Sequence, residues 1–247
     1  MRGTIRVRYN LRVRNNSKKK VAVFDIDGTL FRSSLLIELV EALVEEKIFP
    51  GSVARSYARA YEKWKDRQGP YEEYIAAVVR AFDQNIKGVS EHAFARVVRR
   101  VVEFHRNRLY RYTRDLVRRV KKKGYYLLAI SHSPRYVVAP FAKRLGFNKV
   151  YARFFETDPR GRFTGKASYL DLIDDKQKIL LRAVEKEHLS LKGSYGVGDT
   201  ESDIRFLKMV EHPICFNPNK KLYRAARRYG WPVVVERKDM VYEINSK

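Results

Sequence analysis

Short apolar runs alternate with helical repeats along most of the chain. Val21–Phe24 is rich in β-branched residues and predicts a buried strand that stops at Asp25. Beyond residue 110, segments that predict strands alternate with segments that predict helices, and Gly124 and Gly146 stand where two of these helices would end. The further strands are expected at Tyr125–Ile130, Val150–Ala152, Tyr195–Val197, Ile214–Phe216 and Val233–Val235. This alternation is typical of an α/β protein with a Rossmann-like, doubly wound parallel sheet.

The segment between the first strand and the rest of the sheet has a different character. Apolar residues recur there at helical spacing, beginning with Leu35, Leu36, Leu39, Val40, Leu43 and Val44. Gly51, Gly69-Pro70 and Gly88 divide the segment into about four helices. We therefore expect an α/β core formed by residues 21–32 and 110–247, with a helical cap, residues 33–109, inserted after the first strand.

The first 20 residues are basic and contain no acidic residue. Apolar residues alternate with polar ones between Ile5 and Val13, which is the period of a strand. Three interpretations stay open: a flexible basic arm, an added edge strand, or an extension without function. The whole chain carries a formal charge of +24, which attracts polyanions, phosphorylated metabolites and anionic lipid surfaces without choosing among them. Secondary binding of polyanions through the arm, residues 1–20, is one hypothesis.

Composition excludes several classes of protein. A chain of 247 residues that is 45% apolar can bury the core of an α/β domain. No apolar run approaches the roughly 18 residues that a transmembrane helix needs, and the basic start lacks the apolar region of a secretory signal. The single cysteine, Cys215, excludes an internal disulfide framework and favours a reducing compartment, so we expect a cytoplasmic protein.

Acidic residues follow two of the expected strands. Asp25-Ile26-Asp27-Gly28-Thr29 comes directly after the first strand, and Asp199-Thr200-Glu201-Ser202-Asp203 comes after the strand at Tyr195–Val197. The carboxyl ends of parallel strands meet at one edge of a sheet, so these carboxylates can converge on one metal ion. If Thr200 begins a helix, Asp203 points back toward Asp199. Taken singly, a turn or a helix cap accounts for either motif.

Two further elements complete the set. Ser131-His132-Ser133 follows the expected strand Tyr125–Ile130 and precedes a helix, an arrangement that suits phosphate binding. Lys176 begins a later helix, although in a chain with 52 lysines and arginines one lysine carries little information alone. Together, these motifs predict two acid pairs and a hydroxyl at three strand ends of one sheet.

These four motifs, in this order, resemble those of the haloacid dehalogenase superfamily of phosphatases, and more narrowly its subfamily IB, which includes the phosphoserine phosphatases. The resemblance covers residues 21–32 and 112–235, and in the cap it is limited to general character. It implies a cap of the C1 type and a Mg²⁺-dependent phosphomonoester hydrolase that acts through a phospho-aspartate on a small phosphorylated metabolite. Two alternatives stay open: a phosphotransferase that uses the same intermediate, and a nucleic-acid or anionic-surface binding protein that keeps the fold.

The resemblance implies roles for the acidic motifs. Asp25 would attack phosphorus, and Thr29 would orient it. Asp27 would protonate the leaving oxygen and then activate the water that releases phosphate. Mg²⁺ would be held by Asp25, by Asp199 and by the backbone carbonyl of Asp27, with Asp203 supporting this ligand set.

The resemblance also implies a phosphate site and one departure from the family pattern. Ser131, the backbone amide of His132 and Lys176 would bind the phosphoryl oxygens. Phosphoserine phosphatases place a glutamate for the substrate ammonium where this chain has Ser34, and the nearest acid is Glu38, one helical turn further on. This departure weakens phosphoserine as the substrate.

Overall fold

The computed structural model describes residues 18–168 and 173–244. Most of the basic arm, residues 1–17, lies outside the described residues, so its three interpretations stay open. The first strand begins at Lys19, within the segment expected to be the arm, because Lys19 and Lys20 pair with Leu189 and Ser190 of a neighbouring strand.

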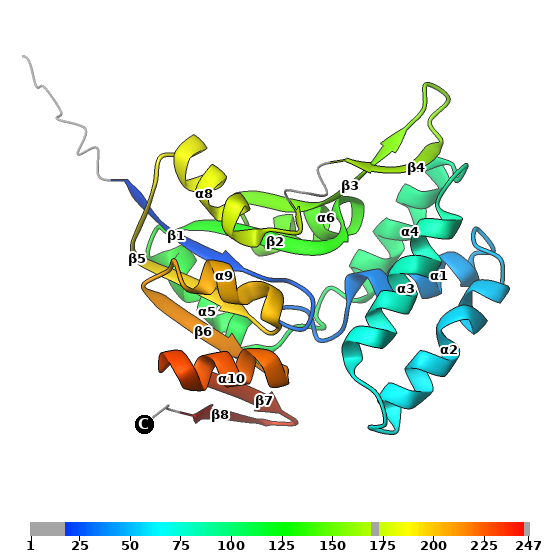
Figure 1. Ribbon diagram of the computed structural model, residues 1–247. Coiled ribbons are helices and arrows are strands. Elements are labelled where there is room, and N and C mark those ends of the chain that lie inside the picture. The colour runs from blue at the N-terminus through cyan, green and yellow to red at the C-terminus, as the bar shows by residue number, and fades with distance from the viewer. Residues whose placement is uncertain (1–17, 169–172, 245–247) are drawn as a thin grey trace, which may run out of the picture.

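Within the described residues, eight strands form one sheet in the order β4-β3-β2-β1-β5-β6-β7-β8 (Figure 1). The strands from β3 to β7 pair in parallel, whereas β4 and β8 pair antiparallel at the two edges. The predicted α/β class with a mostly parallel, doubly wound sheet is therefore confirmed. The strands are β1 (Lys19–Phe24), β2 (Tyr126–Pro134), β3 (Lys149–Thr157), β4 (Phe163–Ser168), β5 (Leu189–Gly198), β6 (His212–Phe216), β7 (Val233–Arg237) and β8 (Met240–Ile244).

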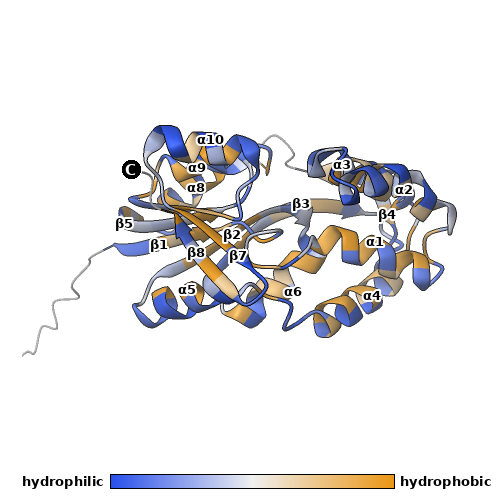
Figure 2. Cartoon of the chain, turned by 90° about the horizontal axis from the view of Figure 1, so that it is seen from below, coloured by the Kyte–Doolittle hydropathy of each residue, from blue (hydrophilic) through white to orange (hydrophobic). Residues whose placement is uncertain are grey.

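Helices cover both faces of the sheet (Figure 2). One face carries α5 (Arg111–Lys122) and α6 (Arg135–Leu145), and the other carries α8 (Lys176–Lys186), α9 (Ile204–Leu207) and α10 (Lys220–Tyr229). The central strand β1 packs against both layers, since Ala22 and Phe24 join one hydrophobic cluster and Val21 and Val23 join the other. Burial on both faces explains why this strand reads as an unbroken apolar run.

Four helices lie between β1 and α5 and group beyond one end of the sheet (Figure 1). They are α1 (Leu35–Glu45), α2 (Ser52–Lys65), α3 (Tyr71–Asn85) and α4 (Glu91–Phe104). They pack through aromatic residues such as Phe82 and Phe94, and the hydroxyl of Tyr136 on α6 donates a hydrogen bond to Glu91 on α4 at 2.7 Å. These are the helices expected in the cap. The division of the chain into a core and a cap stays a prediction.

The edge strand β8 was not expected from the sequence. Its side chains are largely exposed, with Met240 and Tyr242 each 52% accessible, so burial does not hold it in place. Backbone pairing with β7 through Arg237 and Met240 forms a hairpin instead. No helix among the described residues has the length and apolar character that a membrane crossing requires.

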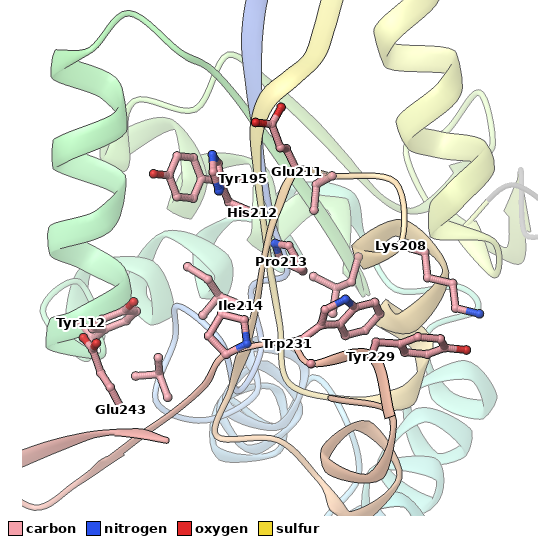
Figure 3. A pocket seen from close by; sticks show the side chains of 15 residues that line it. Tyr112, Tyr195, Lys208, Glu211, His212, Pro213, Ile214, Tyr229, Trp231 and Glu243 are labelled. Atoms are coloured by element: carbon pink, nitrogen blue, oxygen red, sulfur yellow. The ribbon is translucent and has the colours of Figure 1, made fainter. Parts of the chain in front are cut away.

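A cavity of about 680 Å³ lies where β6 and β7 begin (Figure 3). Its walls carry rings from Tyr112, Tyr195, His212, Tyr229 and Trp231. The amino ends of the parallel strands lie here, opposite to the carboxyl ends that carry the acidic motifs. None of the predicted site residues lines the cavity. The predicted catalytic residues therefore lie at the carboxyl ends of the strands, away from this cavity.

Candidate active site

The three central strands bring the predicted motifs to one place. β1 lies between β2 and β5. Strands β2 to β4 follow one another on one side of β1, and β5 to β8 follow one another on the other side, so the strand order reverses at β1. Asp25 follows β1, Ser131 lies near the end of β2, and Asp199 follows β5. The backbone N–H of Asp25 continues the sheet by donating to the carbonyl oxygen of Val197 at 2.9 Å. A switch point of this kind is where open α/β sheets bind their ligands.

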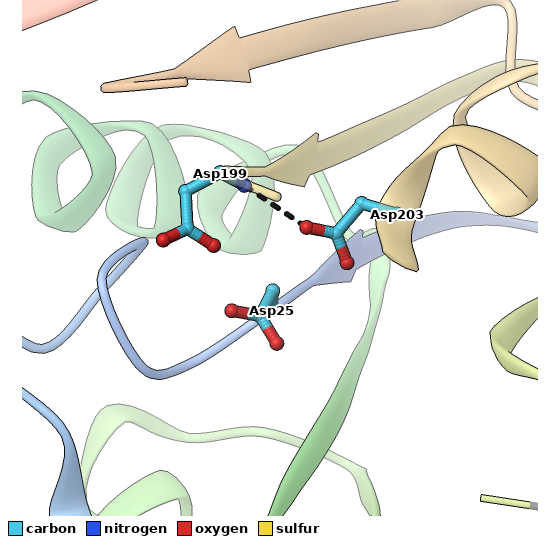
Figure 4. A group of neighbouring side chains, drawn as sticks. All are labelled: Asp25, Asp199 and Asp203. Carbon is cyan, nitrogen blue, oxygen red and sulfur yellow. Dashed lines mark hydrogen bonds between the residues drawn. The ribbon is translucent and has the colours of Figure 1, made fainter. Parts of the chain in front are cut away.

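Asp25, Asp199 and Asp203 form a carboxylate cluster (Figure 4). One oxygen from each lies within 4.8 Å of the others. Asp203 is fixed by the backbone, because its Oδ2 accepts hydrogen bonds from the amides of Asp199 and Thr200, each at 3.0 Å. Gly198 leaves the space for this arrangement, since a Cβ there would lie 2.4 Å from the carboxyl carbon of Asp203.

Lys176 enters the cluster from the start of α8. Its side chain is 2% exposed, and Nζ donates to Asp25 Oδ1 at 2.7 Å and to Asp203 Oδ1 at 2.6 Å. Burial alone would lower the pKa of Lys176, but the carboxylates of Asp203 and Asp25 outweigh it and raise that pKa. The lysine is therefore a fixed positive charge that directly contacts Asp25.

The cluster carries more negative charge than Lys176 compensates. Burial raises the pKa of Asp25 to about 7, although the Lys176 ammonium opposes the rise. Burial, followed by the charges of Asp25 and Asp203, also raises the pKa of Asp199 well above its ordinary value. Burial and the mutual repulsion of the carboxylates thus outweigh the one ammonium of the cluster. A set of carboxylate oxygens suits Mg²⁺, so the residues present fit the predicted ion.

The carboxylate of Asp27 does not join this cluster. Its Oδ1 accepts a hydrogen bond from the backbone N–H of Leu35 at 2.5 Å, and its Oδ2 accepts one from Ser131 Oγ at 2.7 Å. The amide of Ser133 in turn donates to Ser131 Oγ at 3.0 Å. Burial raises the pKa of Asp27, although the hydrogen bond from Ser131 opposes the rise. A positioned carboxyl with a raised pKa is suited to proton transfer near neutral pH.

Thr29 lies between the two strand-end carboxylates. Its Oγ1 is 3.3 Å from Asp25 Oδ2 and 3.2 Å from Asp199 Oδ1, so the hydroxyl can donate to either. The Thr29 backbone is held by Thr113 Oγ1, which donates to the Thr29 carbonyl at 2.9 Å. This geometry is compatible with the predicted orienting role.

Gly28 is expected to be indispensable to the site. Its φ of +74° is strained for any residue with a side chain, and a Cβ there would lie 2.1 Å from Asp199 Oδ2. Replacing Gly28 with Ala should displace Asp199 and lower kcat/KM for an aryl phosphate by roughly 100-fold. The control is Gly51→Ala, because a Cβ at Gly51 meets nothing within 4 Å. Equal activity of the two variants would contradict the assignment of Asp199 to the site.

A second cavity, of about 650 Å³, opens over these residues. Its floor includes Asp25, Asp27, Lys176 and Asp199, and His132 lines it as well. Burial, followed by the charge of Lys176, lowers the pKa of His132 to about 4, so its imidazole is neutral at physiological pH. Its place on the cavity wall agrees with the predicted phosphate site, whereas its roles through the side chain or the amide stay predictions.

Several cavity residues were missed by the sequence reasoning. Tyr71, Glu72, Ile75, Val79 and Arg80 face the cavity from α3, and Arg153 faces it from β3. The α3 positions share one side of a helix, which the spacing predicts, but the spacing does not say which neighbour that side meets. Ser34 does line the cavity. Glu38 is not among the residues lining it, and instead pairs with His105 at 3.0 Å and with Arg108 at 2.7 Å.

Known proteins are similar to this chain in sequence and in fold. A histidinol-phosphatase from Neisseria meningitidis serogroup C (strain 8013) is 25% identical over 230 residues, which cover 87% of this chain and 98% of that protein. A phosphoserine phosphatase from Archaeoglobus fulgidus is 24% identical over 209 residues, which cover 84% of this chain and 55% of that protein. A solved phosphoserine phosphatase, in a phospho-aspartyl intermediate analogue, shares the fold with a TM-score of 0.59 at 20% identity, covering 90% of this chain and 95% of that one.

The family assignment follows from the length of the match. Residues 22–208 match the haloacid dehalogenase-like hydrolases, and this range includes the second half of β1, the whole of β2 and β5, and all four motifs. The predicted resemblance to the phosphatases of this superfamily, with phosphoserine phosphatases among the relatives, is confirmed. The chain belongs to the haloacid dehalogenase-like hydrolase family.

Proposed function

We propose that the protein is a Mg²⁺-dependent phosphatase that hydrolyses a small phosphomonoester through a phospho-aspartate on Asp25. The observation that carries the proposal is the buried contact of Asp25 with Lys176, beside the carboxylates of Asp199 and Asp203. Relatives named histidinol-phosphatase and phosphoserine phosphatase support the reaction class.

The first step joins Asp25 to the phosphoryl group. A carboxylate oxygen of Asp25 attacks phosphorus, and the bond from phosphorus to the alcohol oxygen breaks. Mg²⁺, held by Asp25, Asp199 and the Asp27 carbonyl with support from Asp203, would supply positive charge that offsets the repulsion between the nucleophile and the phosphate. Lys176 adds a second positive charge at the same place, and its contact with Asp25 keeps the nucleophile oriented.

Asp27 moves the protons in both steps. Its carboxyl protonates the departing alcohol oxygen, and the resulting carboxylate then accepts a proton from the water that hydrolyses the phospho-aspartate. The hydrogen bonds from Leu35 and Ser131 hold the carboxyl in position between the two steps. Ser131 and His132 lie beside it, where a hydroxyl and a backbone amide would bind phosphoryl oxygens.

The test is release of inorganic phosphate from para-nitrophenyl phosphate with and without Mg²⁺. We expect release that depends on Mg²⁺ and stops on addition of a chelator. A screen of phosphorylated metabolites, beginning with histidinol phosphate and phosphoserine, would then identify the substrate. No release of phosphate from any of these compounds in the presence of Mg²⁺ would refute the proposal.

Binding of Mg²⁺ should compete with protons at the carboxylate cluster. Without the ion, the folded protein binds more protons than the unfolded chain between the ordinary Asp25 pKa of 3.8 and the raised value of about 7. Stability from this group is therefore present at low pH and is lost as pH rises through about 7. Since Mg²⁺ replaces those protons, we expect it to stabilise the fold by at least about 1 kcal/mol more at about pH 8 than at about pH 5.

Calorimetric or denaturant unfolding with and without Mg²⁺ at both pH values measures this difference. A stabilisation by Mg²⁺ that is equal at both pH values, or larger at the lower one, would contradict the proposed metal site.

Two alternative functions and the cellular location were also expected from the sequence. The phosphotransferase alternative finds no specific support among the described residues, and the arm that motivated the polyanion-binding alternative lies mostly outside them. A cytoplasmic location stays part of the proposal, supported by the single cysteine, Cys215, whose thiol is free and buried.

A further inference from the structure

A third cavity, of about 440 Å³, is lined by basic side chains and is called the basic cavity below. It lies between α5, α6 and the segment that follows α4, which are on one side of the molecule in Figure 2. It shares no lining residue with the catalytic cavity. The basic residues that line it are Arg106, Arg114, Arg118, Lys121 and Arg144, and no acidic residue of the described chain is among its lining residues.

At one place beside the basic cavity, two arginines share one carboxylate. Glu103 on α4 accepts hydrogen bonds from Arg144 on α6, at 2.5 Å, and from Arg106 in the segment that follows α4. The Arg144 guanidinium, followed by that of Arg106, lowers the pKa of Glu103, so this carboxylate is charged at neutral pH. One negative charge therefore serves two positive ones.

Helix α5 repeats this arrangement. Asp115 accepts hydrogen bonds from Arg114 at 2.9 Å and from Arg118 at 3.3 Å, and Arg114 lowers the pKa of Asp115. Lys121 lies three residues beyond Arg118, and the ion pairs among the described residues do not include it. The five cations that line the cavity thus share two carboxylates, and positive charge is in excess around it.

The backbones that carry these cations are held in place. α5 buries Val120 and α6 buries Phe141 in the same hydrophobic cluster. The segment between α4 and α5 is tied to the loop after Thr29, because the backbone N–H of Arg32 donates to the carbonyl oxygen of Arg108 at 3.1 Å. Charges on elements that are already fixed lose less conformational entropy when they bind a ligand.

The chemistry of the lining indicates the class of ligand. Guanidinium groups bind phosphoryl oxygens through paired, parallel hydrogen bonds, which makes arginine the preferred residue for such groups. A cavity of this volume has the size of a small-molecule site. Its cations are distributed over three elements, so linked phosphoryl groups match them better than a single phosphate does. Val117, Phe141 and Leu145 add an apolar part to the lining.

We propose that the basic cavity binds a small anion that carries two or three linked phosphoryl groups, at a site separate from the catalytic cavity. The arginines would donate hydrogen bonds to the phosphoryl oxygens, and the Lys121 ammonium would add a further positive charge. Inorganic oligophosphates and nucleotides share this chemistry.

The experiment titrates the full-length protein with inorganic tripolyphosphate in an isothermal calorimeter. Mg²⁺ is omitted, because the metal would bind the tripolyphosphate itself. The variant combines Arg118→Gln with Lys121→Gln. The control combines Arg224→Gln with Arg227→Gln, two exposed residues of α10 on the opposite face of the sheet, which removes the same charge at the same helical spacing.

We expect one site per chain, with a Kd that rises by about tenfold or more in the cavity variant, because hydrogen bonds to charged groups are lost. The control should keep the wild-type Kd. Arg144→Gln, which leaves α5 unchanged, should weaken binding as well. Equal weakening in the two double variants would show attraction by overall charge alone and would overturn the inference, as would no binding by the wild type at about 1 mM tripolyphosphate.

ATP, titrated in the same way, distinguishes the two sources of phosphoryl groups. Tighter binding of ATP than of tripolyphosphate, weakened by the cavity variant, assigns the site to nucleotides. Equal or weaker binding of ATP assigns it to inorganic oligophosphates. Either result upholds the site, provided that the cavity variant binds more weakly than the control.

Discussion

Replacing Asp25 with Asn is expected to lower kcat for para-nitrophenyl phosphate by about 10⁴-fold or more, because the side-chain amide of Asn does not form the acyl phosphate that the reaction requires. The folded protein should tolerate the change, because Lys176 keeps its ion pair with Asp203 at 2.6 Å. Asp25 is buried with a pKa raised to about 7, so its charge is unfavourable in the absence of a metal, and the neutral amide removes that cost. Steady-state assays and denaturant unfolding in a chelator measure the two effects separately.

The matched control for this variant is Asp66→Asn. Asp66 is exposed at the end of α2, far along the chain from any motif residue, so its replacement should leave activity unchanged. Asp25→Asn that retains more than about a hundredth of the wild-type kcat would remove Asp25 from the role of nucleophile.

Replacing Lys176 with Met is expected to affect stability and activity together. The change leaves Asp25 and Asp203 buried without their ammonium, and the loss of one partner from a buried ion pair costs about 3–5 kcal/mol. That cost corresponds to a fall in Tm of roughly 6–20 °C for a chain of this size. The effect should be larger at about pH 8 than at about pH 5, because Asp25 with its raised pKa is protonated at the lower pH.

Activity of the Lys176→Met variant should fall by about 10²-fold to 10³-fold, as one charge that stabilises the transition state is removed. Lys178→Met is the control, since Lys178 is on the same helix with a side chain that is 67% exposed and 4.0 Å from Asp175. If both variants unfold at the same denaturant concentration in a chelator at about pH 8, the buried ion pair does not hold the site as described.

The strand-end chemistry could be predicted because it depends on short stretches of sequence. Asp25 and Asp199 each follow a buried strand, and the geometry of a parallel sheet brings neighbouring strand ends together. Asp203 lies one helical turn beyond Asp199, and that spacing returns its carboxylate to the Asp199 amide. Lys176 could be placed only through the family resemblance, because nothing local distinguishes it among the many basic residues.

The wall of the cavity formed by α3 could not be predicted in the same way. Glu72 and Tyr71 lie in the cavity because α3 packs with one side toward the core, a contact between segments more than 100 residues apart, as in the pair Glu72 and Asn219. Helical spacing identifies that side of α3 but not its neighbour. Glu38, which the sequence identifies only as the acid nearest to Ser34, pairs with His105 and does not line the cavity.

The most direct test of the central claim is to identify the phosphorylated residue by mass spectrometry after acid quenching of the enzyme during turnover of para-nitrophenyl phosphate. The proposed mechanism predicts a phosphorylated peptide containing residues 21–32, with the phosphoryl group on Asp25, that is absent without Mg²⁺ and in Asp25→Asn. A phosphoryl group on any other residue, or turnover by direct attack of water with no phosphorylated enzyme at any time, would contradict it.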